Sequence, residues 1–282
     1  MEFRTKVDIE DPGFRIGPCE EMLFVGSCFA DSIGACFREE GFPVTVNPYG
    51  TMYNPASILH TVERWLAQGV RNHVQSDHTE FPSPRVVFLT LGTNHVYRLK
   101  ATGEIVDNCQ KRPQSLFIVE ELSVEACVDY LTRAIEMLRQ ANPDVHVVLT
   151  VSPNRYRKYG YHGSRLSKAT LLLAVEEICA HRYPSVVYFP AYEIVDDELR
   201  DYRFYAEDML HPSAQTVGYI WERLVETYCS AEAKAFLAEW APLKAALNHK
   251  PFEPESEAYK AFMDKTMLKV AALRKKYPTF AL

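Results

Sequence analysis

The chain has 282 residues, of which 47% are hydrophobic and 24% are charged, a composition typical of a globular protein. Its formal net charge of -6 supplies no general positive field, which argues against nucleic acid or an anionic membrane as the main partner. The seven cysteines include no Cys-x-x-Cys pair, and we see no apolar leader or bilayer-spanning run, so we expect a soluble, cytoplasmic protein with reduced thiols.

Short apolar runs alternate with helical patterns through most of the chain. Strands are expected at 22–25, 43–46, 85–91, 145–151 and 186–189, and helices after Ser27 and at 55–68, 123–140, 164–181 and 213–228. Alternation of this kind predicts an α/β fold, with a mostly parallel sheet and helices on both faces.

Two segments depart from this alternation. Residues 95–121 contain two strand-like runs around Thr102-Gly103, which predict a small inserted hairpin that could form a wall of the site. From residue 231 the pattern is helical and ends in a basic helix at 259–276. We therefore expect an α/β domain over 1–230 and a helical extension over 231–282, which could cover that domain or form a homodimer.

Ser27 lies at the turn between the first strand and the first helix. A side chain there projects from the carboxyl end of a strand, and the backbone N–H groups that open the helix can face a developing negative charge. This is a suitable place for a nucleophile and part of an oxyanion hole. The alternative is that Gly26 makes the turn and Ser27 only caps the helix.

A carboxylate and an imidazole are three residues apart in Asp208-Met209-Leu210-His211. In a helical turn or a tight loop both can project the same way, and the carboxylate then fixes the imidazole tautomer, leaving the other ring nitrogen as a general base. The alternative is a loop aspartate followed by a solvated histidine.

Polar residues also follow the strand at 85–91, in Gly92-Thr93-Asn94-His95. In an open sheet of strand order 2-1-3-4-5, ligands bind between the carboxyl ends of strands one and three. Ser27 and Asn94 are therefore predicted to meet at one site.

These motifs, taken in order along the chain, resemble the serial blocks of the SGNH, or GDSL-type, hydrolases. The sequence also resembles one branch of that clan, the GSCFA family, through the stretch Gly26-Ser27-Cys28-Phe29-Ala30 itself. Further matching segments are 47–51, 91–93, 108–109, 167–169 and 188–193, so the resemblance covers roughly residues 20 to 225.

The resemblance implies an α/β/α sandwich with Ser27 as nucleophile, His211 as general base and Asp208 as the acid that orients it. It also implies an oxyanion hole built from the N–H groups of Ser27 and Gly50 and the side-chain amide of Asn94. It implies acyl transfer through a seryl intermediate, with no metal or organic cofactor.

Other residues complete the expected site. Cys28 is a second candidate nucleophile, although we expect its side chain to point away from Ser27 into packing. The aromatic and polar residues expected near the substrate are Tyr49, Tyr53, His95, Tyr97 and Arg155. Arg155 belongs to a basic segment that also holds Arg165 and Lys168, which could receive an anionic substrate or form a solvated surface.

From these residues we expect a serine esterase that removes a short acyl group, such as acetyl, from a carbohydrate-like or small alcohol. An acyltransferase would use the same three residues. A ligand-binding or scaffold protein on the same fold is the third alternative, favoured by His95, which stands where the wider clan usually carries an aspartate.

Overall fold

The computed structural model describes residues 4–75, 84–181 and 183–282. Its centre is a five-stranded sheet, built from β1 (Met22–Gly26), β2 (Val44–Val46), β3 (Val86–Leu91), β7 (His146–Val151) and β8 (Val186–Tyr188). The strand order is β2-β1-β3-β7-β8, and all four neighbouring pairs are parallel. The predicted α/β fold is thereby confirmed, and its strand order is the 2-1-3-4-5 order considered from the sequence.

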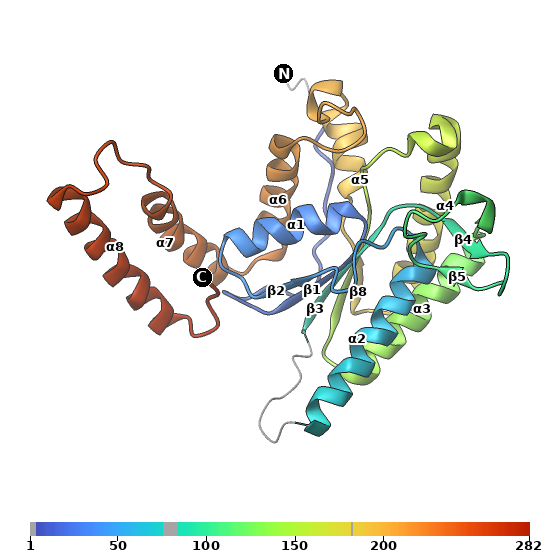
Figure 1. The fold of residues 1–282 in the computed structure, drawn as a ribbon, viewed down its shortest axis with the longest axis horizontal. Coiled ribbons are helices and arrows are strands. Elements are labelled where there is room, and N and C mark those ends of the chain that lie inside the picture. The colour runs from blue at the N-terminus through green and yellow to red at the C-terminus, as the bar shows by residue number, and fades with distance from the viewer. Residues whose placement is uncertain (1–3, 76–83, 182) are drawn as a thin grey trace.

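Helices cover both faces of this sheet (Figure 1). Side chains of β1 alternate between the two cores, because successive residues of a strand point to opposite faces. Phe24 packs in one core with α1 (Cys28–Glu39) and α6 (Ala214–Tyr228). Val25 packs in the other with α2 (Pro55–Gln75), α3 (Val124–Ala141) and α4 (Gly160–His181).

The inserted segment after β3 contains the hairpin that we predicted and one further strand. It forms a three-stranded antiparallel sheet in the order β5-β4-β6, from β4 (His95–Leu99), β5 (Ile105–Val106) and β6 (Phe117–Glu121). The third strand was missed because Val119, Glu120 and Glu121 are exposed and show no apolar alternation.

Some helix ends also differ from expectation. Helix α2 continues past Gln68 to Gln75, α4 begins at Gly160 instead of Ser164, and a short helix α5 (Ala191–Glu193) leads into a π-helix at Ile194–Leu199. Single 3-10 turns lie at Gln114–Leu116, Arg157–Tyr159 and Tyr202–Phe204.

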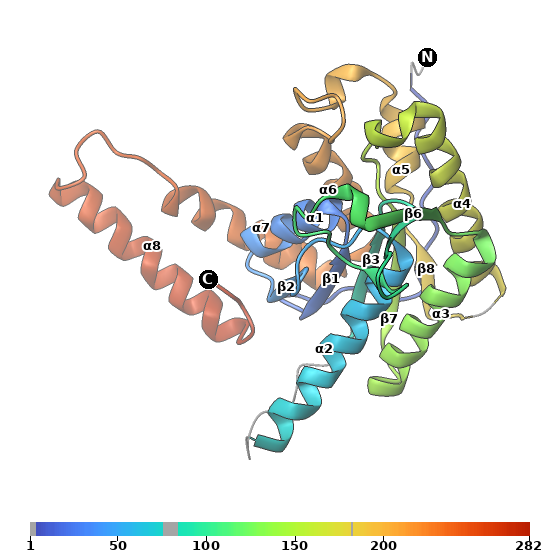
Figure 2. The ribbon, with the colours of Figure 1, turned by 45° about the vertical axis from the view of Figure 1, so that its right-hand side comes forward.

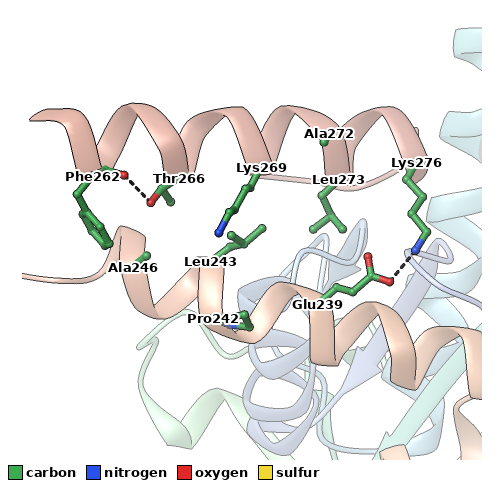
Figure 3. A pocket seen from close by; sticks show the side chains of 10 residues that line it. All are labelled: Glu239, Pro242, Leu243, Ala246, Phe262, Thr266, Lys269, Ala272, Leu273 and Lys276. Carbon is green, nitrogen blue, oxygen red and sulfur yellow. Dashed lines mark hydrogen bonds and ion pairs between the residues drawn. The ribbon is translucent and has the colours of Figure 1, made fainter.

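The last part of the chain forms α7 (Ala231–Leu247) and α8 (Glu257–Lys276), which project together from the side of the sheet at which β2 lies (Figure 2). Phe236 and Trp240 of α7 and Phe280 near the carboxyl terminus join the core that contains α1. Between α7 and α8 lies a cavity of about 500 Å³, at whose end Lys276 pairs with Glu239 at 2.6 Å (Figure 3). None of the described helices is both long and apolar enough to cross a membrane.

Candidate active site

The turn after β1 brings three strand ends together. Gly26 has φ +142°, and a Cβ there would lie 2.1 Å from the carbonyl oxygen of Thr90 at the end of β3. The backbone N–H of the next residue, Ser27, donates to that same oxygen at 3.0 Å. Only glycine permits this close approach, which sets the positions of Ser27 and Cys28 at the start of the next helix.

Ser27 caps helix α1. Its backbone is extended, its Oγ accepts a hydrogen bond from the N–H of Phe29 at 3.3 Å, and it lies 3.3 Å from Thr90 Oγ1. The whole residue is buried, with no exposed surface. The expectation that His211 faces this hydroxyl is wrong, because a capping side chain folds back onto the N–H groups of its own helix.

Cys28, the first residue of α1, faces the histidine instead. Its Sγ lies 3.5 Å from His211 Nε2 and accepts a hydrogen bond from Asn154 Nδ2 at 3.3 Å, and the Tyr53 hydroxyl also hydrogen-bonds the sulfur. Cys28 is half-buried. The expectation that its side chain is turned into the packing is therefore wrong as well.

His211 and Asp208 are paired, as their spacing predicts. His211 Nδ1 lies 2.6 Å from Asp208 Oδ2, while Asp208 Oδ1 accepts the backbone N–H groups of Leu210 and His211 at 2.8 and 3.0 Å. These bonds, the backbone bond from His211 foremost, lower the pKa of Asp208 to about 2. An ionised Asp208 holds the proton on Nδ1, so that Nε2 offers a lone pair to the thiol.

Burial raises the pKa of the Cys28 thiol above its ordinary value of 9.0. The thiol is therefore protonated at neutral pH, and it needs a base in order to attack. Nε2 of His211 is placed to be that base.

Of the three groups expected in the oxyanion hole, the two backbone N–H groups donate elsewhere, and the Asn94 amide uses one of its two N–H donors elsewhere. The N–H of Ser27 donates to Thr90 O, the N–H of Gly50 donates to Asn47 O at 2.8 Å, and Asn94 Nδ2 donates to Leu122 O at 2.8 Å. The donors that do lie at Sγ are Asn154 Nδ2, the Tyr53 hydroxyl and, at the amino terminus of α1, the backbone N–H of Cys28 itself. Asn154 was not singled out as a donor from the sequence.

The residues expected around the substrate separate into two groups. Tyr53 lies at the thiol, and Arg155 lines a neighbouring cavity. Tyr49 instead packs on α2, where its hydroxyl donates to Gln68 and its ring lies under Arg64. His95 and Tyr97 belong to a further cluster around Tyr159.

That cluster closes the site on the side of β4. The His95 ring stacks on Tyr159 at a centroid distance of 3.6 Å, and its Nδ1 lies 2.9 Å from Thr93 Oγ1. Tyr97 OH lies 3.4 Å from Tyr159 OH and also contacts Lys158. Burial lowers the pKa of His95, which fits a neutral packing role better than contact with substrate.

Lys168 holds the strand ends below the thiol. Its ammonium, fully buried, donates to Gly92 O at 2.7 Å and to Ser152 O at 2.6 Å, which joins the chain after β3 to the chain after β7. Burial lowers its pKa from 10.5 to about 7. The sequence placed Lys168 in a matching segment and a basic patch, but no local pattern predicts a buried ammonium between two carbonyls.

Over 4–75, 84–181 and 183–282, no group of three or more His, Cys, Asp or Glu side chains is placed to hold a metal ion.

Comparison with known proteins identifies a family. The model of the GSCFA family matches residues 21–79 and 66–224, and a model described as the C-terminal domain of GSCFA domain proteins matches residues 240–282. A comparison with curated proteins found no match.

Solved structures give more distant similarities. One is a carbohydrate esterase family 3 protein from Talaromyces cellulolyticus, 13% identical over 73% of this chain and 94% of that one, with a TM-score of 0.42. A member of the lipolytic protein G-D-S-L family from Veillonella parvula is 15% identical over 74% of this chain and 98% of that one, with a TM-score of 0.43. An acetyl xylan esterase from Butyrivibrio proteoclasticus is 12% identical over 75% and 63%, with a TM-score of 0.41.

Proposed function

The chain belongs to the GSCFA family, as its resemblance predicted, and we propose that it is an acyl hydrolase whose nucleophile is the thiol of Cys28. The observation that carries this proposal is the contact between Cys28 Sγ and His211 Nε2 at 3.5 Å, with Asp208 bound to the far side of the imidazole. A thiol, a base that can remove its proton and a group that orients the base are the parts that nucleophilic acyl transfer requires.

The reaction proceeds in two steps. His211 Nε2 takes the thiol proton as Sγ attacks the ester carbonyl carbon, and the tetrahedral oxyanion receives hydrogen bonds from Asn154 Nδ2 and the N–H of Cys28. Collapse of this intermediate expels the alcohol oxygen, which takes the proton back from His211, and leaves an acyl thioester. Water, deprotonated by His211, then attacks the thioester, and the thiol leaves with that proton as the acid is released.

Transfer to another alcohol in place of water would use the same residues, so an acyltransferase is the same site with a different acceptor. The short acyl group and carbohydrate-like alcohol expected from the sequence remain part of this proposal. Tyr53, which contacts the thiol and is partly exposed, supplies an aromatic surface beside the reacting carbonyl.

The test is the hydrolysis of p-nitrophenyl acetate by the parent protein and by single variants at equal folded concentration. Cys28→Ala and His211→Ala are expected to lose kcat/KM by at least about 1000-fold. Cys179→Ala, which removes another half-buried thiol near the carboxyl end of α4, should match the parent. An acid quench during turnover should leave an acetyl group on the Cys28 peptide, which hydroxylamine removes.

Ser27→Ala separates the two candidate nucleophiles. It should lose about 1 kcal/mol of stability, because the cap of α1 is removed, yet keep the activity of the folded protein. If Ser27→Ala is inactive while Cys28→Ala retains its rate, the proposal is wrong. If no variant hydrolyses any ester and no adduct forms, the protein is a binding protein on this fold.

A further inference from the structure

A cavity of about 550 Å³ lies beside the thiol. Asn154 forms part of its wall, while its Nδ2 reaches Cys28 Sγ at 3.3 Å. Met209, also in the wall, directly follows Asp208. A molecule in this cavity would therefore contact Asn154, whose side chain lies between it and the Cys28 sulfur. Its volume falls within the range of sites that hold small ligands.

Arg155 presents a guanidinium to this cavity. Its backbone N–H donates to Leu210 O at 2.9 Å, and its Nη1 donates to Met209 O at 3.0 Å. Rings enclose the guanidinium carbon on several sides: Tyr161 at 4.3 Å and Tyr202 and Tyr205 at 5.4 Å each. A guanidinium carries five N–H donors in one plane, so this anchored group keeps donors for a ligand.

The charge of Arg155 is not matched by an acid. In the part of the chain that the structure describes, no carboxylate forms an ion pair with Arg155, whereas its neighbour Arg165 pairs with Asp196 and donates to Tyr192 OH at 2.5 Å. The third basic side chain in the wall, Lys168, donates hydrogen bonds to two backbone carbonyls.

An adjoining recess of about 240 Å³ shares Arg155, Arg165 and Asp196 with this cavity. It adds one more cation, Arg200, and two more acids, Asp197 and Asp201. The recess is therefore lined by three cations, Arg155 among them, and three acids, whereas the cavity is lined by three basic side chains and one acid, Asp196.

We propose that this cavity binds an anionic ring compound, with its carboxylate or phosphate oxygens on Arg155 and its ring against the surrounding tyrosines. The inference rests on the proposed function, since it makes that compound the acyl or alcohol part of the ester. Charge-assisted hydrogen bonds to a planar guanidinium favour carboxylate and phosphate oxygens, and tyrosine rings offer flat apolar faces to a sugar ring.

Binding is tested without turnover, by calorimetric titration of the Cys28→Ala protein with glucuronate, glucose 6-phosphate and glucose. These probes share a ring and differ in charge, and the first two distinguish a carboxylate from a phosphate. We expect at least one anionic sugar to bind about tenfold more tightly than glucose, a preference that falls as salt is raised. Equal affinity for glucose, or no binding of either anion up to about 10 mM, overturns the inference.

The matched variants are Arg155→Gln, Arg155→Lys and Arg203→Gln in the same background. Arg203 is an exposed arginine of the same region that pairs with Asp201 and does not line the cavity. Arg155→Gln should abolish the preference for the anion, Arg155→Lys should keep part of it, and Arg203→Gln should keep all of it. A preference that survives Arg155→Gln shows that Arg155 only braces the loop at Met209, and overturns the inference.

Binding in Cys28→Ala is read independently of catalysis. An anionic preference together with an inactive parent protein would reject the hydrolase and keep the cavity assignment. An active parent protein without the anionic preference would keep the hydrolase and reject the cavity assignment.

Discussion

Ser27 and Cys28 are adjacent but take different roles, because they occupy different positions at the start of helix α1. Ser27 is the capping residue, whose hydroxyl satisfies the N–H of Phe29, whereas Cys28 is the first helical residue and projects outward to His211. The position of each residue at the helix start, and not the chemistry of its side chain, therefore decides that the thiol and not the hydroxyl faces His211.

Alkylation of Cys28 is expected to follow the raised pKa of its thiol. Because burial disfavours the thiolate, the rate with iodoacetamide should increase through pH 9 and continue to increase above it. Quantifying the alkylated Cys28 peptide by mass spectrometry between pH 6 and pH 10 measures this profile. A rate that is already constant at pH 6 would instead indicate a thiolate–imidazolium pair in the resting protein.

Gly26 is expected to be the most sensitive glycine of the site. Gly26→Ala places a Cβ 2.1 Å from the Thr90 carbonyl oxygen and requires φ +142°, so we expect a loss of about 3 kcal/mol or more in the free energy of unfolding. Gly103→Ala is the matched control, since its φ is +74° and no atom lies within 4 Å of its Cβ. That control should lose only about 1 kcal/mol in urea unfolding, and equal losses would contradict the steric argument.

Helices α7 and α8 show how a terminal element is tied to the domain. Phe280 lies 5.5 Å from the Phe236 ring and 4.9 Å from the Trp240 ring, and the N–H of Ala281 donates to Gly41 O at 2.9 Å. Gly41 leaves room for this contact, because a Cβ there would lie 2.0 Å from Phe280. The extension over 231–282 thus shares a core with α1.

Phe280→Ala is expected to lower the free energy of unfolding by about 3 kcal/mol, since it opens a cavity in this core. Phe252→Ala removes the same side chain from a fully exposed position and should change stability by less than about 0.5 kcal/mol. Urea unfolding compares the two, and kcat/KM per folded molecule should be unchanged in both. Equal stability of the two variants would show that the tail is not part of the cooperative unit.

For the molecule as a whole, buried thiols make stability fall in alkali. Burial raises the pKa of Cys19, Cys127, Cys179 and Cys229 to about 12 and that of Cys36 to about 11. The folded state therefore keeps protons that the unfolded state loses, so stability is complete below pH 9 and is lost between pH 9 and about 12. At pH 10 the loss is about 1 kcal/mol per thiol.

Lys168 acts in the opposite direction. Its folded pKa of about 7 lies below the ordinary 10.5, so the unfolded state binds more protons and this group adds stability as pH rises from 7 to 10.5. The free energy of unfolding of the parent, from urea unfolding with a reductant, should therefore fall from pH 8 to pH 10. That of Lys168→Met should fall further over the same range, by up to about 2 kcal/mol more than in the parent. Parallel curves would mean that Lys168 is not charged differently in the two states.

Local patterns were sufficient to predict the elements and part of the chemistry. Apolar runs and caps locate the five strands of the sheet, and the three-residue spacing allows Asp208 to pair with His211, because both signals depend on neighbours in the chain. The family, too, is readable from short segments such as 26–30.

The identity of the group that meets the histidine depends on contacts between distant residues. The register of β1 on β3 gives the N–H of Ser27 to Thr90, and the end of β7 brings Asn154 to Cys28 across 126 residues. Lys168 reaches two carbonyls in the same way, from α4. No local pattern records which donors such contacts use or leave, so only the packed strands decide which side chain meets His211 and which donors surround it.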